Sequence, residues 1–132
     1  IREHYVSKAA SDISALPSVR IKLVEIQREI AKNDCVVLDG RDIGTYVLPD
    51  AKYKFFITAT PEVRAKRRFE ELKAKGDAPS YEKVLEDIKV RDYNDSHRAF
   101  APLKQADDAV LVDTTNMSID EVIDFVLNKM EK

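Results

Sequence analysis

The stretch YKFFITATPEVRAKRRFEELKAKG (53–76) decides the fold class, because it joins an apolar run directly to a clearly bounded helix. A continuous apolar run such as residues 53–59 is typical of a strand that is covered on both faces, as in a parallel sheet. Thr60 can cap the helix that follows, Pro61 suits its first position, and Gly76 can close its end. This order predicts one strand–helix unit of an α/β fold.

The rest of the chain repeats this alternation of strands and helices. Two further apolar runs predict buried strands, CVVLD (35–39) and AVLVDTT (109–115). Apolar residues at helical spacing predict further helices at 18–32, 80–98 and 118–130. We therefore predict an α/β fold, a parallel sheet wound with helices on both faces. Ligands of such folds bind beyond the carboxyl ends of the strands.

Length and charge narrow the class of protein. The chain has 132 residues, which suits one domain, and its 22 basic and 24 acidic residues nearly cancel. That balance disfavours a protein specialised for nucleic acid, which usually carries a basic excess.

The one cysteine, Cys35, follows Asp34 and opens an apolar run, which predicts a small buried side chain in a reducing compartment. Without an apparent signal peptide or membrane span, we expect a soluble, cytoplasmic protein with no membrane partner.

The segment DGRDIGT (39–45) places unusual charge at the carboxyl end of the first predicted strand. Gly40 and Gly44 let the backbone turn sharply. Arg41 could offer a planar fork to a phosphate or carboxylate, and Asp42 could accept hydrogen bonds from an amino group or face a hydrated cation. The alternative is a plain turn with an Asp–Arg surface pair.

A second charged group, Arg91, Asp95 and Arg98, follows helical spacing. These residues share one helix face, which continues the apolar stripe of residues 81–88. Charges on an inward face are costly unless a ligand or an ion partner meets them. The alternative is an exposed ion pair on a helix that projects past the core.

A third group, Arg64, Arg67 and Arg68, forms a basic helix edge that could close over phosphates. The alternative is a solvated basic face that Glu70 and Glu71 balance.

The spacing of His and Cys residues suggests no metal site. Three arginine groups with several aspartates suit a highly anionic ligand. Phosphoryl transfer is the reaction that needs such charge most, because its catalysis rests on positioning and charge stabilisation.

The chain also resembles bacterial cytidylate kinases over almost its whole length. The stretches that carry the resemblance are AAS…ALPSVR (9–20), VVLDGRDIGTYVLPDA (36–51), KFFITATPEVRAKRR (54–68), VLEDIKVRDYNDSHRAFAPL (84–103) and AVLVDTTNMSIDEVI (109–123). The combination of DGRDIGT with the pattern RDxxDSxRAxAPL is specific. The resemblance implies a P-loop nucleoside monophosphate kinase fold. It also implies transfer of the γ-phosphoryl group of ATP, with Mg²⁺, to CMP or dCMP, which gives CDP or dCDP.

The resemblance implies roles for individual residues. The acceptor-site residues would be Ser11, Arg20 and Asp42 for the cytosine, Arg41 and Arg98 for the phosphate, and Arg91 and Asp95 for the sugar. The catalytic arginines would be Arg41, Arg98 and the lid residues Arg64, Arg67 and Arg68, with the lid and its flanking helices at 61–98. Within DGRDIGT, Asp42 would then recognise the base while its neighbour Arg41 holds the phosphate.

The chain departs from the family pattern in one respect. Family members carry a glycine-rich loop ending in Gly-Lys-Ser/Thr, whereas none of the three glycines here lies in such a loop. We therefore expect residues 1–132 to be a single partial domain, roughly the C-terminal 60% of an enzyme, that lacks the central strand of the sheet. Strands 35–39 and 53–59 should then flank a gap. A missing N-terminal segment or another chain would fill it, or the two strands would close up.

We expect the 132 residues alone to show little or no kinase turnover. The alternative function is a non-catalytic pyrimidine-nucleotide-binding module that uses the same acceptor residues. A nucleic-acid-binding protein is disfavoured by the balanced charge. The sequence leaves the choice between CMP and dCMP open.

Overall fold

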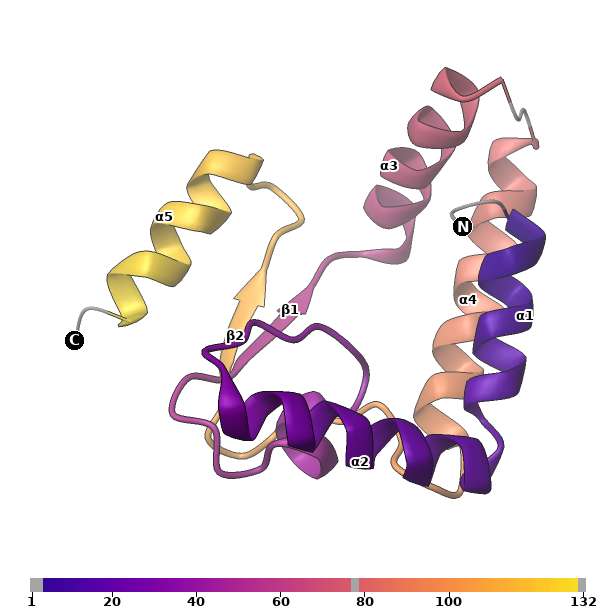
Figure 1. The fold of residues 1–132 in the computed structure, drawn as a ribbon. Coiled ribbons are helices and arrows are strands. Elements are labelled where there is room, and N and C mark those ends of the chain that lie inside the picture. The colour runs from indigo at the N-terminus through magenta and orange to yellow at the C-terminus, as the bar shows by residue number, and fades with distance from the viewer. Residues whose placement is uncertain (1–3, 77–78, 131–132) are drawn as a thin grey trace.

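The computed structural model describes residues 4–76 and 79–130. The elements in chain order are α1 (His4–Ser14), α2 (Pro17–Asn33), the π-helical turn η1 (Ile43–Val47), β1 (Phe55–Thr58), α3 (Pro61–Ala74), α4 (Tyr81–His97), β2 (Val110–Asp113) and α5 (Ile119–Met130). The two strands lie at the centre of Figure 1, between α5 on one side and the pair α3 and α4 on the other. None of the described helices is long and apolar enough to cross a membrane.

The described residues form one two-stranded parallel sheet. Its register runs from Phe55 opposite Val110 to Thr58 opposite Asp113. The chain between the two strands passes through α3 and α4, as a parallel connection requires. This arrangement confirms the predicted α/β class. Within the described residues, β1 pairs with β2 and not with the run at 35–39.

The segment 35–39 corrects two expectations. It forms no strand in the described structure, and Val37 is 100% exposed. Cys35 is exposed as well, not buried as its apolar neighbours suggested. The physical reason is the absence of a ladder partner among the described residues. An apolar run becomes a buried strand only when another strand pairs with its backbone and other elements cover its side chains.

Helices α3 and α4 pack into a hairpin with a small core of its own. Ala65, Leu72 and Val84 are buried between them, and four further side chains pack around these: Phe69, Tyr81, Leu85 and Ile88. The stripe predicted on 80–98 therefore faces inward, as expected. Caps fix the starts of both helices, because the Thr60 hydroxyl accepts from Val63 N and the Ser80 hydroxyl accepts from Lys83 N.

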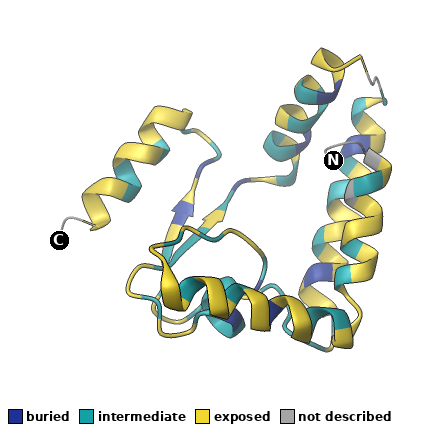
Figure 2. Ribbon diagram, viewed as in Figure 1, coloured by how far each residue is buried: buried dark blue, intermediate teal, exposed yellow. Residues whose placement is uncertain are grey.

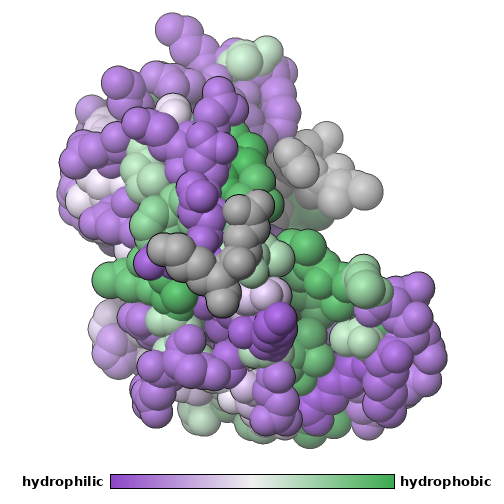
Figure 3. Space-filling view, turned by 90° about the vertical axis from the view of Figure 1, so that its left-hand side faces the viewer, coloured by the Kyte–Doolittle hydropathy of each residue, from purple (hydrophilic) through white to green (hydrophobic). Residues whose placement is uncertain are grey.

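The apolar faces of α2 and α5 are largely open, as the exposed colouring in Figure 2 shows. Leu23, Ile26 and Ile30 of α2 are exposed, although apolar residues at helical spacing usually face a core. Ile119 and Leu127 of α5 are exposed too. Figure 3 shows apolar side chains gathered between two hydrophilic parts of one face. The helix pattern was right, but the described elements cover these stripes only in part.

The last turn of α3 yields a prediction about pH. Glu71 accepts hydrogen bonds from Lys75 Nζ at 2.5 Å and Arg68 Nη1 at 2.9 Å, and these contacts lower the pKa of its carboxyl to about 2. Because the folded pKa lies below the ordinary value, the contribution to stability is complete above that ordinary value and disappears as the pH falls toward 2.

We expect a carbon-13 NMR titration of Glu71 to give a midpoint near 2, and Lys75→Ala to move it upward. The Lys75 ammonium is the largest cause of the shift, so removing it should have the larger effect. A midpoint that Lys75→Ala leaves unchanged would contradict this explanation. Glu25 pairs with Lys22 on the surface of α2 and serves as a control carboxyl in the same spectra.

Candidate functional site

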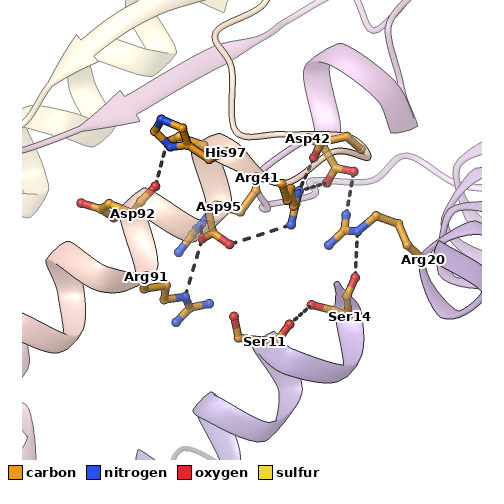
Figure 4. Close-up of polar contacts among 12 residues, drawn as sticks. Ser11, Ser14, Arg20, Arg41, Asp42, Arg91, Asp92, Asp95 and His97 are labelled. Carbon is orange, nitrogen blue, oxygen red and sulfur yellow. Dashed lines mark hydrogen bonds and ion pairs between the residues drawn. The ribbon is translucent and has the colours of Figure 1, made fainter. Parts of the chain in front are cut away.

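A connected network of ion pairs joins charged side chains from three parts of the chain (Figure 4). Its members come from α2, from the loop before η1, and from α4 and its end: Arg20, Arg41, Asp42, Arg91, Asp95 and Arg98. Six of the seven residues that the sequence suggested for the acceptor site therefore lie in one network. The alternative of separate surface pairs is not what the structure shows.

Asp42 is the more deeply buried of the two carboxylates, with 3% of the residue exposed. Its Oδ2 accepts from Arg20 Nη1 at 2.6 Å, and its Oδ1 lies 3.9 Å from Arg98 Nη2. The backbone carbonyl of Asp42 accepts from Tyr46 N and Val47 N, so η1 fixes the position of the residue. A short π-helical turn next to the charged loop thus sets where this carboxylate lies.

Asp95 is the second centre of the network, with 7% of the residue exposed. Its Oδ2 accepts from Arg41 Nε at 2.9 Å and lies 3.7 Å from Arg91 Nε, while Oδ1 lies 3.8 Å from Arg98 Nη1. Its backbone carbonyl accepts from Leu103 N at 2.7 Å, which ties the loop after α4 to the helix. Three guanidinium groups therefore surround one buried carboxylate.

Arg98 lies between the two carboxylates, and only 12% of its side chain is exposed. Its Nε donates to the Ala101 carbonyl at 2.6 Å, whereas its buried Nη2 has no hydrogen-bond partner in the described structure. Burial lowers the pKa of this guanidinium, the nearby Arg20 lowers it further, and Asp42 and Asp95 act in the opposite direction. A buried donor without a partner is costly, so this group is suited to meet an acceptor from a ligand.

The sequence did not single out two residues that orient the network. Ala101 has a φ of 47°, a left-handed backbone rare for a residue with a Cβ, and its carbonyl receives Arg98 Nε. The Ser14 carbonyl accepts from Arg20 Nε at 2.9 Å. Ser14 lies three residues after Ser11, and its hydroxyl donates to the Ser11 carbonyl at 3.0 Å. Ser11 is thus linked to the network through Ser14.

The lid arginines do not join this network, and they do not act as one basic edge. Arg64 Nη1 and Nη2 bind the Asp92 carboxylate at 2.9 and 2.6 Å, and its Nε donates to the Ala59 carbonyl at 2.9 Å. The sequence did not predict Asp92 as the partner of Arg64, because the two residues are too far apart along the chain for spacing to indicate a contact.

Arg67 and Arg68 each have other partners. Arg67 donates to the Thr114 hydroxyl at 3.1 Å and to the Thr114 carbonyl at 2.7 Å. Arg68 pairs with Glu71 at 2.9 Å, as the alternative of a balanced basic face anticipated. Because Ala59 and Thr114 directly follow β1 and β2, Arg64 and Arg67 both reach the carboxyl end of the sheet. That is the edge where α/β folds place ligands.

Among residues 4–76 and 79–130, no group of three His, Cys, Asp or Glu side chains could hold a metal ion. The network instead carries an excess of positive charge. Its four guanidinium groups outnumber its two carboxylates, which leaves a net charge of +2. A phosphate monoester carries about −1.5 to −2 charge at neutral pH. The arrangement can therefore neutralise one phosphate group and offer hydrogen bonds from oriented donors.

Comparison with known proteins gives one consistent result. The family model described as cytidylate kinase matches residues 1–132. The cytidylate kinase of Caldicellulosiruptor saccharolyticus is 54% identical over 132 residues, which is 100% of this chain and 58% of that protein. That of Bacteroides thetaiotaomicron is 54% identical over 121 residues, 92% of this chain and 53% of the relative. The chain thus spans little more than half the length of these curated relatives.

Proposed function

The chain belongs to the cytidylate kinase family, and from this premise we propose that it carries the acceptor-nucleotide site of a nucleoside monophosphate kinase. In a protein of the relatives' length, the activity would be transfer of the γ-phosphoryl group of ATP to CMP or dCMP, which gives CDP or dCDP. The observation that carries the proposal is the network around the buried carboxylates of Asp42 and Asp95.

The proposed base-recognition group is Ser11, Arg20 and Asp42. Cytosine presents an amino donor beside ring acceptors, which a carboxylate and a guanidinium complement. The contact of 2.6 Å between Arg20 and Asp42 supports this role, because it keeps an acceptor and a donor side by side. The inclusion of Ser11 is supported by Ser14, whose hydroxyl donates to the Ser11 carbonyl and whose own carbonyl accepts from Arg20 Nε.

The proposed phosphate group is Arg41 with Arg98, and Arg91 with Asp95 would hold the sugar. The Arg98 Nη2, which has no hydrogen-bond partner in the described structure, supports the first assignment, because a phosphate oxygen would satisfy it. Arg41 keeps 40% of its side chain exposed while Asp95 Oδ2 accepts from its Nε. A fork of this kind binds phosphate in a defined orientation.

The lid residues Arg64, Arg67 and Arg68 are proposed to approach the phosphates of the donor. Their contacts at the carboxyl end of the sheet support this for Arg64 and Arg67. Mg²⁺ would enter with ATP and balance charge on its phosphates. The described residues offer no cluster of metal ligands, so we assign no residue of this chain to Mg²⁺.

The test uses a chimeric kinase, in which this chain replaces the matching part of the C. saccharolyticus relative. We expect it to phosphorylate CMP with ATP, because the replaced part is 54% identical to this chain. The measurement is a coupled assay of ADP release, with AMP as the control acceptor. The 132 residues by themselves should show little or no turnover, since their sequence holds no Gly-Lys-Ser/Thr loop for the donor phosphates.

Two outcomes would contradict the proposal. If the chimera phosphorylates AMP as fast as CMP, the assignment of Ser11, Arg20 and Asp42 to recognition of cytosine is wrong. Calorimetric binding of CMP by the chimera without any phosphoryl transfer would favour the alternative of a non-catalytic pyrimidine-nucleotide-binding module.

A further inference from the structure

Helix α4 connects the acceptor network to one arginine of α3. Asp95 turns its carboxylate toward Arg41 and Arg98. Asp92, three residues earlier on the same helix, turns its carboxylate toward Arg64 of α3. Because one continuous helix carries both carboxylates, the position of Arg64 is tied to the element that forms the acceptor site.

Three hydrogen bonds fix the Arg64 guanidinium. Its Nη1 and Nη2 meet the two oxygens of Asp92 at 2.9 and 2.6 Å, which is the parallel two-bond geometry of a strong arginine–carboxylate pair. Its Nε meets the Ala59 carbonyl at 2.9 Å, just past the end of β1. A guanidinium has five N–H groups. These three bonds therefore leave part of the fork able to meet a further acceptor, and 35% of the side chain is exposed.

This pair is not needed to hold the hairpin together. The contact between α3 and α4 already buries Ala65, Leu72 and Val84, and Phe69 packs edge-on against Tyr81. Both partners of the ion pair are about one-third exposed, at 35% and 33%. Solvent screens an ion pair at such a site, so burial of the apolar side chains contributes more to the stability of the hairpin than the pair does. What the geometry does provide is a single orientation for a long, otherwise flexible cation.

We propose that Asp92 is a positioning residue that holds Arg64 at the carboxyl end of β1, so that its remaining N–H groups meet the phosphates of the donor nucleotide. This inference rests on the proposed function, because it takes ATP as the donor. An arginine that is oriented beforehand loses less side-chain freedom when it binds, so the same contact gives higher affinity. Asp92 would act through Arg64 and touch no substrate.

The test is Asp92→Asn in the chimeric kinase. We expect the KM for ATP and the calorimetric Kd for ATP to rise about tenfold, while the KM for CMP changes less than about twofold. Asp92→Glu keeps the charge and should recover most of the loss. Arg64→Ala should show a loss of similar size, and the double variant should lose no more than Arg64→Ala alone. Glu25→Gln, in an exposed pair on α2, is the control.

The possible outcomes separate this inference from the proposed function. Unchanged or improved ATP binding in Asp92→Asn overturns the inference, and so does a loss that adds fully to that of Arg64→Ala. If the chimera transfers no phosphoryl group to CMP but Asp92→Asn still weakens ATP binding about tenfold, the proposed function fails and the positioning role stands. Failure of the unaltered chimera to bind ATP overturns both.

Discussion

Replacing Asp42 with alanine in the chimeric kinase should lower its free energy of unfolding by about 3–5 kcal/mol, the range for breaking a buried ion pair from one side. Asp42 is 3% exposed, and its carboxylate lies between the guanidinium groups of Arg20 and Arg98. Removing it leaves two cations close together in a poorly hydrated place. Urea unfolding followed by circular dichroism measures the loss.

The double variant Arg20→Ala with Asp42→Ala provides the internal check. Because the second substitution removes one of the two stranded cations, the double loss should be smaller than the sum of the single losses. Glu25→Ala, in the exposed pair with Lys22, is the matched control and should change stability by less than about 1 kcal/mol. A loss from Asp42→Ala no larger than this control would show that the pair with Arg20 is not buried in solution.

Arg98→Ala should weaken CMP binding to the chimera by about 1.5–3 kcal/mol, the range for a hydrogen bond to a charged group. This corresponds to a rise in Kd of about ten- to 150-fold. Arg98 lies at the centre of the network with only 12% of its side chain exposed. Its buried Nη2 has no hydrogen-bond partner in the described structure, so a phosphate oxygen gains a donor that is already in place. Calorimetric titration with CMP measures the change.

Binding of cytidine, which lacks the phosphate, distinguishes a role of Arg98 in binding phosphate from a general disruption of the site. Cytidine binding should fall much less than that of CMP in Arg98→Ala, because the base would contact Arg20 and Asp42 and only the phosphate would contact Arg98. Arg41→Ala should weaken CMP binding in the same range. Unchanged CMP binding in both arginine variants would remove the phosphate assignment.

Local sequence signals predicted much of the fold. The strand before Thr60 and the helix that begins at Pro61 are both present, because an apolar run, a cap and a proline act over a few residues. The run at 35–39 was predicted equally firmly and forms no strand. Whether it becomes a strand depends on a pairing partner, and nothing within the run reveals one. The exposure of Cys35 has the same cause.

The candidate site was predictable to a similar extent. Helical spacing indicated that Arg91, Asp95 and Arg98 share a face, and the structure places all three in one network. Their connection to Arg20 and Asp42 came from the resemblance, since spacing carries no information about contacts between distant segments. The left-handed backbone of Ala101 and the ion pair between Arg64 and Asp92 both depend on tertiary packing. No pattern in the sequence could have shown them.

A crystal structure of the chimeric kinase with CMP bound tests the central claim most directly, namely that residues from α2, the loop before η1 and α4 form one pocket for a pyrimidine mononucleotide. We expect the cytosine against Arg20 and Asp42 and the phosphate against Arg41 and Arg98. CMP bound elsewhere, such as against Lys66, Phe69 and Tyr81 in the groove beside α3, would contradict it.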